Sequence, residues 1–205
     1  MTYERLISQL AHVELVSPAP DETVRYLVDV LGLSETARTP DAVYLRCWGD
    51  FFHHSVKIVE GPAPALGHVG WRTEGPDQLA AAVARLESAG AGEGWVDDET
   101  GHGPAYRYRG PGGHLQEVFW EVERYRAPTG EASTFPARPQ RHAPRGVAPR
   151  QLDHVTVATR DPYGDSIWYR DTLAYRFTEY TALDEEHPDV IVFSMVTTNE
   201  KSHDL

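Results

Sequence analysis

The chain has 205 residues, a formal net charge of −12 at pH 7 and an apolar fraction of 40%. The acidic balance argues against a nucleic-acid backbone or an anionic membrane surface as main partner, because both require a basic face. No apolar run approaches the ~20 residues of a membrane helix, the single cysteine allows no internal disulfide, and the N-terminus shows no secretory pattern. We therefore expect a cytoplasmic protein that binds small molecules or other proteins.

The chain contains three copies of the pattern Leu-x-His-Val. The copies stand at residues 10–13, 66–69 and 152–155. Each is followed by an alternating run, a turn and an amphipathic helical stretch, so each is expected to open a unit of its own. The first and third copies keep one ungapped register: His12 and His154 are 142 positions apart, and so are Leu31 and Leu173.

The first two units show the same order of predicted elements. In the first, strand-like runs follow the helical stretch at residues 43–47 and 52–59. In the second, the pattern predicts a strand at 66–72, a helix at 76–89 and strands at 105–109 and 114–120. Leu79, Val83 and Leu86 share one face of that helix. The predicted fold is therefore α+β, with tandem βαβββ modules, two complete and a third incomplete.

Residues 125–150 differ in composition from the rest of the chain. They contain five prolines and no strand pattern, which indicates an extended linker. The third unit begins at Gln151, with a predicted helix that runs through Ile167 and Leu173, and strand-like runs at 176–182 and 190–197. We predict an N-terminal two-module domain at 1–124, a linker at 125–150 and the first part of a C-terminal domain at 151–205.

The third unit is shorter than the first. Aligning residues 54–56 with 203–205 places Leu205 at the start of a strand, so the last strand and a fourth module would be missing. A half-built sheet leaves an unpaired edge and an uncovered apolar face, which proteins normally avoid. We therefore expect a fragment, a split subunit or a truncated form of a larger protein.

The modules carry a family resemblance. A His opens one strand, a His opens the matching strand of the next module, and a Glu lies on that module's last strand. The chain thereby resembles the vicinal oxygen chelate superfamily, and more closely its two-domain extradiol dioxygenases of the catechol and homoprotocatechuate 2,3-dioxygenase type. The segments that carry the resemblance are residues 10–15, 26–33, 43–46, 52–54, 152–154 and 202–204.

The resemblance implies a fold, an activity and a metal. It implies aromatic-compound degradation by extradiol cleavage of a catechol-type ring with O2 at a mononuclear non-haem Fe(II), with Mn(II) as the occasional alternative, giving a muconic semialdehyde-type product. In that family two His and one Glu hold the metal and leave three positions open for the vicinal oxygens and O2. It also implies a homo-oligomer, although no residue shows this.

The family's functional residues carry over at two positions. His154 matches the first iron ligand, and His203 matches the acid/base histidine that handles the protons of the reaction. The second His ligand and the Glu ligand belong to a part of the pattern that this chain does not contain. Without the resemblance, His154 would be interpreted as an ordinary strand histidine, and nothing would indicate a function for His203.

The first two modules offer an alternative metal set. His12, His68 and Glu117 occupy the matching three ligand positions, and Glu117 shares one face of its strand with Phe119. The competing interpretation is a buried His pair that is hydrogen-bonded to the Glu and needs no ion.

The remaining histidines are interpreted more simply. His53 and His54 are adjacent and cannot both enter one site, and His102 in its Gly-rich loop suggests a loop or subunit-contact role. His142 and His187 are expected to be solvated.

Three functions therefore stay open at this point. The first is extradiol cleavage, the second a non-redox small-molecule binding protein, and the third a metal-dependent isomerase that uses the N-terminal set. The place where metal binds distinguishes them. The sequence does not indicate which catechol would be the substrate.

Overall fold

The computed structural model of the protein describes residues 4–97, 99–142 and 145–205. The first module contains β1 (Ile7–Ser17), α1 (Pro20–Tyr26), the π-helical turn η1 (Leu27–Leu31), β2 (Ser34–Arg38), β3 (Ala42–Arg46) and β4 (Val56–Glu60). The second contains β5 (Ala65–Thr73), α2 (Pro76–Ser88), β6 (Gly92–Val96), β7 (Ala105–Arg109) and β8 (Leu115–Phe119). The third unit contains α3 (Pro162–Leu173), β9 (Arg176–Ala182) and β10 (Ile191–Thr197).

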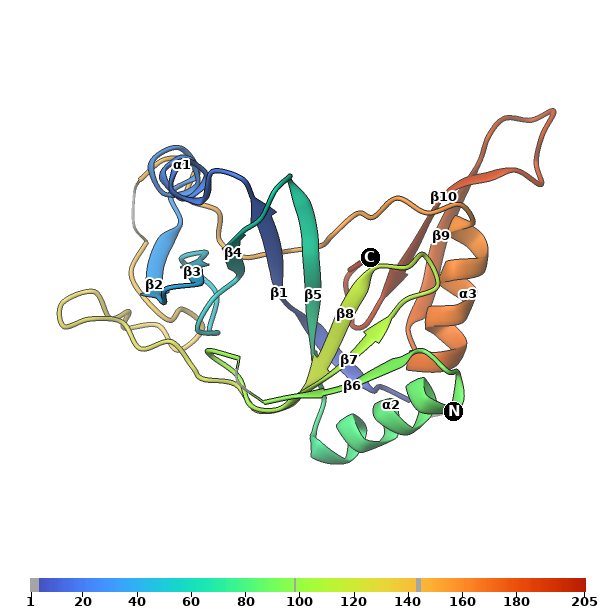
Figure 1. Cartoon of the computed structure of the whole chain (residues 1–205), viewed down its shortest axis with the longest axis horizontal. Coiled ribbons are helices and arrows are strands. Elements are labelled where there is room, and N and C mark those ends of the chain that lie inside the picture. Colours follow the sequence, from blue (N-terminus) through green and yellow to red (C-terminus); the bar gives the residue numbers. More distant parts are fainter. Residues whose placement is uncertain (1–3, 98, 143–144) are drawn as a thin grey trace.

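The two modules share one eight-stranded sheet, in the order β2-β3-β4-β1-β5-β8-β7-β6 (Figure 1). In each module the first strand pairs in parallel with the last, β1 with β4 and β5 with β8. The two first strands pair antiparallel at the centre of the sheet. The repeated βαβββ modules predicted from the sequence are thereby confirmed.

Most predicted elements of these modules form where the pattern placed them. The predicted helix 76–89 is α2, which begins with Pro76 at its first turn and buries Val83 and Leu86. The strand at 105–109 forms over those same residues. The pattern did not locate β2 and β6, because both are edge strands with polar or glycine-rich sequences, and such strands lack a clear apolar alternation.

The third unit follows the predicted register in its helix. Helix α3 ends at Leu173, and η1 ends at Leu31, its counterpart in the first copy. Strands β9 and β10 confirm the two strand-like runs and pair as an antiparallel hairpin.

The strand expected over residues 152–158 does not form, which corrects the sequence-based prediction. Among the described residues, its backbone makes one hydrogen bond to a backbone group outside the segment, from Val155 N to Asp204 O at 3.1 Å, whereas β1 is held between β4 and β5. The equivalent bond in the first module joins Val13 N to Ser55 O at 3.0 Å. This equivalence confirms the alignment of residues 54–56 with 203–205.

The linker has no helix or strand in its described residues, 125–142 and 145–150, as predicted. It is nevertheless docked on the first module. Trp48 Nε1 donates to Ala148 O at 3.0 Å, and Gly49 N donates to Arg150 O at 2.7 Å. The division into domains at 124 and 150 stays a prediction.

A buried polar network joins the third unit to the second module. Gln116 on β8 accepts hydrogen bonds from Trp71 Nε1 at 2.7 Å and from Tyr108 OH at 2.9 Å, and its amide nitrogen donates to the hydroxyl of Tyr169 on α3. The ring of Tyr175 packs edge-on against Trp71 with centroids 5.6 Å apart. The hydrophobic core is therefore continuous from the eight-stranded sheet into the third unit.

Removing the Tyr169 hydroxyl tests this contact. Tyr169→Phe leaves the buried amide nitrogen of Gln116 without an acceptor, so we expect a loss of about 1–3 kcal/mol in the free energy of unfolding. Urea denaturation measures it. Tyr163→Phe, on the same helix but with an exposed ring, is the matched control, and equal stability of Tyr169→Phe and the parent chain would show that the contact does not stabilise the protein.

Large apolar side chains are exposed on the β9–β10 hairpin: Tyr180, Leu183, Val190, Val192 and Phe193. Within the described residues, no helix has the length and apolar character to cross a membrane.

Candidate functional site

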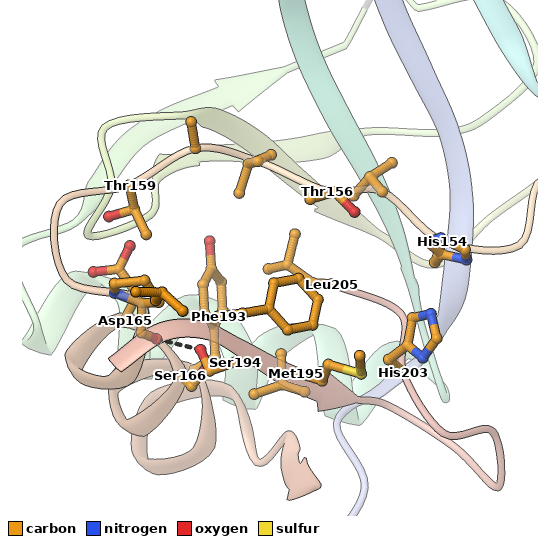
Figure 2. A pocket seen from close by; sticks show the side chains of 17 residues that line it. His154, Thr156, Thr159, Asp165, Ser166, Phe193, Ser194, Met195, His203 and Leu205 are labelled. Atoms are coloured by element: carbon orange, nitrogen blue, oxygen red, sulfur yellow. Dashed lines mark hydrogen bonds between the residues drawn. The ribbon is translucent and has the colours of Figure 1, made fainter. Parts of the chain in front are cut away.

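A cavity of about 370 Å³ lies between residues 154–159, α3, β10 and residues 203–205. This size falls in the usual range of small-molecule pockets. Its walls are mainly apolar, and Figure 2 shows Phe193, Met195 and Leu205 along them. His154 and His203 stand together at one end, while Asp165 and Thr159 lie at the other. A small, mostly apolar molecule with polar groups at its ends would suit such a cavity.

The structure brings together the two residues that the family resemblance singled out. The rings of His154 and His203 have centroids 4.4 Å apart. The matching rings of the first module, His12 and His54, are 4.7 Å apart. The same pair of histidine rings therefore occurs at equivalent positions in the first module and in the third unit.

Each ring of the pair is held through Nδ1. His154 Nδ1 lies 3.0 Å from Asp153 Oδ2, and His203 Nδ1 lies 2.8 Å from Ser202 Oγ. The hydrogen bond from His154, with a smaller contribution from Lys201, lowers the pKa of Asp153. When Nδ1 donates to the carboxylate, Nε2 of His154 keeps its lone pair and can bind a metal.

Lys201 connects the segments that carry the two histidines. Its ammonium lies 2.7 Å from Asp204 Oδ1 and donates to the backbone oxygen of Asp153. The Asp204 carboxylate is fully buried and also accepts from Thr198 N at 2.7 Å and Thr197 Oγ1 at 2.9 Å. Lys201 and the buried Asp204 carboxylate therefore join the two segments that carry these rings.

The described residues do not complete an iron site at this cavity. Only one group of three ligating side chains with donor atoms within 4.8 Å of one another occurs in the described ranges, and neither His154 nor His203 belongs to it. The opposite end of the cavity holds Asp165, whose pKa is raised by burial, and a hydrogen bond of 2.7 Å between Ser166 and Ser194.

That group consists of His12, His102 and Glu117 and belongs to a second, buried site at the central strands. His12 on β1 and His68 on β5 each have Nε2 3.4 Å from Glu117 Oε1 on β8, and His102 Nε2 lies 3.2 Å from the same oxygen. We call these four side chains the histidine cluster. The three residues of the predicted alternative set are thus brought together, and all three are buried.

Two further histidines were underestimated from the sequence. His102, expected in a loop or subunit contact, is turned inward with its side chain only 3% exposed and stacks on Phe119 at 4.2 Å, which corrects that interpretation. The buried ring of His54 packs on His12, whereas His53 stays half-buried. An isolated antiparallel β-bridge between His102 and Val122 holds this loop in place. No local sequence pattern predicts such a contact.

Burial and charge act in opposite directions in the histidine cluster. Burial lowers the pKa of His12 to about 4. Burial would also lower the pKa of His68, but Glu117 and Glu14 outweigh it and raise that pKa to about 9. For Glu117 burial would raise the pKa, yet the three rings hold it well below its usual range.

A half-buried ion pair next to the histidine cluster makes stability depend on pH. Lys57 Nζ lies 2.8 Å from Glu14 and 2.7 Å from Glu99. Burial would raise the pKa of Glu14, but His68 and Lys57 lower it to about 2, from an ordinary value of 4.5. The stabilisation is therefore fully present above pH 4.5 and is lost as the pH falls through 2.

We expect Glu14 to account for up to about 2 kcal/mol of the unfolding free energy lost between pH 5 and pH 3. Urea unfolding at the two pH values measures the loss. Glu14→Gln cannot titrate, so its loss should be smaller by that amount. The same pH dependence in both proteins would contradict the assignment.

Comparisons with known proteins agree with this architecture. The family model of the glyoxalase/bleomycin resistance protein/dioxygenase superfamily matches residues 9–118. A metapyrocatechase of Geobacillus stearothermophilus is 42% identical over 173 residues, covering 84% of this chain and 53% of that protein. A manganese-dependent 2,3-dihydroxybiphenyl 1,2-dioxygenase of Geobacillus genomosp. 3 is 32% identical over 179 residues, covering 86% of this chain and 56% of that protein.

A solved structure shows the same fold. The 2,3-dioxygenase LapB from Pseudomonas sp. KL28 aligns with a TM-score of 0.84 at 23% identity, covering 97% of this chain and 68% of that chain. The present chain spans about half the length of the curated relatives it matches. The family match covers most of both complete modules. The chain therefore belongs to the glyoxalase/bleomycin resistance protein/dioxygenase superfamily.

Proposed function

We propose that this chain takes part in extradiol cleavage of a catechol-type ring by O2. The observation that carries the proposal is the His154–His203 pair, 4.4 Å apart at the end of a largely apolar cavity of about 370 Å³. The names of the matched relatives, a metapyrocatechase and a manganese-dependent dioxygenase of a dihydroxybiphenyl, support the same reaction class. The proposal includes a cytoplasmic location and a homo-oligomeric assembly.

The chain's own residues would bind the ring and move protons. The apolar side chains of β10 would hold the flat face of the ring, with its two hydroxyl groups toward His154 and His203. His203 would take a proton from one hydroxyl through its ring nitrogen and return it later in the reaction. Ser202, bonded to Nδ1, would keep that ring oriented.

The metal in this proposal is Fe(II), with Mn(II) as the alternative. His154 would be one of its ligands, and the other ligands would have to come from outside the residues described here. When bound, such a metal coordinates vicinal oxygens and lets electron density pass from the ring to O2.

The test measures oxygen uptake with catechol. We would co-express the chain with the part of the Geobacillus stearothermophilus metapyrocatechase that its match leaves uncovered, and load the purified pair anaerobically with Fe(II). This preparation is called the completed assembly below, and the chain alone is assayed beside it. The proposal predicts iron-dependent uptake by the completed assembly and a ring-cleavage product in equal amount.

The alternatives predict other results. A metal-dependent isomerase at the histidine cluster would consume no O2 and would be sensitive to His68→Ala. A binding protein without redox chemistry would bind catechol without any dependence on metal. A folded, iron-containing completed assembly that takes up no O2 with catechol or 2,3-dihydroxybiphenyl would contradict the proposal.

A further inference from the structure

We propose that the histidine cluster is a closed structural site for a divalent transition-metal ion of the zinc type, with His12, His68, His102 and Glu117 as its four ligands. The site is separate from the cavity that holds His154 and His203. It would join the two modules, because β1 comes from the first and β5 and β8 from the second. It goes beyond the proposed function, since its occupation does not depend on extradiol chemistry.

The distances from Glu117 Oε1 to the ring nitrogens fit a small ion, and the ligand atoms of His12, His102 and Glu117 all lie within 4.8 Å of one another. Three ring nitrogens lie 3.2–3.4 Å from Glu117 Oε1. With metal–ligand bonds of about 2.0–2.1 Å, tetrahedral ligands stand about 3.3 Å apart. His12 Nε2 and His68 Nε2 are closer, at 2.9 Å, and would have to separate by a few tenths of an ångström. Three nitrogens and one oxygen form a donor set that zinc accepts.

The outer nitrogens of two rings are held in a way that leaves Nε2 as the ligand atom. His102 Nδ1 lies 2.8 Å from Gly103 O, an acceptor, so Nδ1 carries the proton. His68 Nδ1 faces Glu14 Oε2 at 3.6 Å. Carboxylates and backbone carbonyls behind a histidine are the usual outer partners of metal-bound rings.

The oxygen at the centre of the cluster lacks a proper hydrogen bond. Glu117 Oε1 is fully buried and receives no well-aligned donor from the described residues. In a neutral ring with its proton on Nδ1, the Nε2 lone pair of His102 faces this carboxylate oxygen at 3.2 Å, and two such acceptors call for a cation, which is either a proton on the ring or a bound metal ion. Arg107 Nε lies 3.4 Å from the other oxygen, Oε2, which leaves Oε1 alone to face the rings.

The backbone leaves room for the ring of His12. Gly70 is the register partner of His12 on β5, and a Cβ there would lie 2.3 Å from His12 Cε1. The adjoining cavity measures only about 10 Å³, which is at the lower limit for a single water molecule. A site this closed suits a structural ion, since catalytic sites keep a position open.

The experiment measures zinc in the full-length chain. The chain is stripped with a chelator, given one equivalent of Zn²⁺, dialysed and analysed by inductively coupled plasma mass spectrometry. We expect one ion per chain in the parent, in His154→Ala and in the exposed-histidine control His187→Ala. His102→Ala and Glu117→Gln should bind it more than about 100-fold more weakly, since even outer partners contribute 10- to 100-fold. Circular dichroism checks that each variant is folded.

If His102→Ala does not fold, a second variant tests whether residue 102 is a metal ligand. His102→Cys replaces one ligand type by another, so its Co²⁺ complex should gain a thiolate-to-metal charge-transfer band that the parent Co²⁺ complex lacks, even though the parent contains the buried Cys47. A folded parent that retains no zinc overturns the proposal. So does zinc that is retained in His102→Ala and lost in His154→Ala, or a Co²⁺ spectrum that His102→Cys leaves unchanged. If the chain retains zinc but the completed assembly takes up no oxygen, the zinc site is supported and only the proposed function is contradicted.

Discussion

Replacing His203 by Asn is expected to lower the turnover number for ring cleavage in the completed assembly by about 100- to 1000-fold, because a positioned acid/base group contributes about 10²–10⁴. Asn can keep a hydrogen bond to Ser202 but cannot carry a proton at neutral pH. The ring of His203 does not support the core, so the variant should fold like the parent. The measurement is oxygen uptake at saturating catechol.

His187→Ala is the control for this substitution. His187 lies in the exposed turn between β9 and β10, where it pairs with Asp184 at 2.7 Å. Its oxygen uptake should match that of the parent. A His203→Asn protein with less than about a threefold loss would show that His203 does not transfer the proton, because such a loss is far below acid/base catalysis.

Replacing Arg46 by Met is expected to lower the free energy of unfolding by about 3–5 kcal/mol, because several buried carbonyl groups would lose their donor together. Arg46 is fully buried, and its guanidinium donates to the backbone oxygens of Cys47, Trp48 and Asp50 at 2.7–3.1 Å. It also donates to Gln140 in the linker and lies over the Tyr125 ring at 3.5 Å. Arg46 therefore adds a buried side-chain attachment to the backbone bonds that hold the linker on the first module.

Arg38→Met is the matched control. Arg38 is exposed on β2 and pairs with Glu35 and Asp21 at the surface, and surface ion pairs contribute little. Urea denaturation of both variants measures the difference, and proteolysis of residues 125–150 should speed up only in Arg46→Met. Equal midpoints for the two variants would show that Arg46 does not attach the linker.

The sequence predicted the parts of the fold that depend on local periodicity. Helix α2 and strand β7 each carry a clean apolar pattern, and both form where it placed them. The segment 152–158 repeats the pattern of β1 but forms no strand, because a strand needs neighbours and this one makes a single backbone bond to residue 204.

Some residues of the candidate sites could likewise be predicted from the sequence, and others could not. His12, His68 and Glu117 were predictable because they occupy repeated positions on strands that the topology brings together. His102 was not, because it reaches Glu117 from a loop whose path is fixed only by a bridge to Val122. His154 and His203 were singled out by the family resemblance, but their pairing is seen only in the structure, and their roles stay a proposal.

The most direct test of the central proposal is iron-dependent oxygen uptake with catechol by the completed assembly, compared between the parent and His154→Ala. If this part of the chain carries the extradiol site, His154→Ala abolishes uptake, while His187→Ala leaves it unchanged. Uptake that survives His154→Ala but disappears with His68→Ala would contradict the proposal and place the reaction at the histidine cluster.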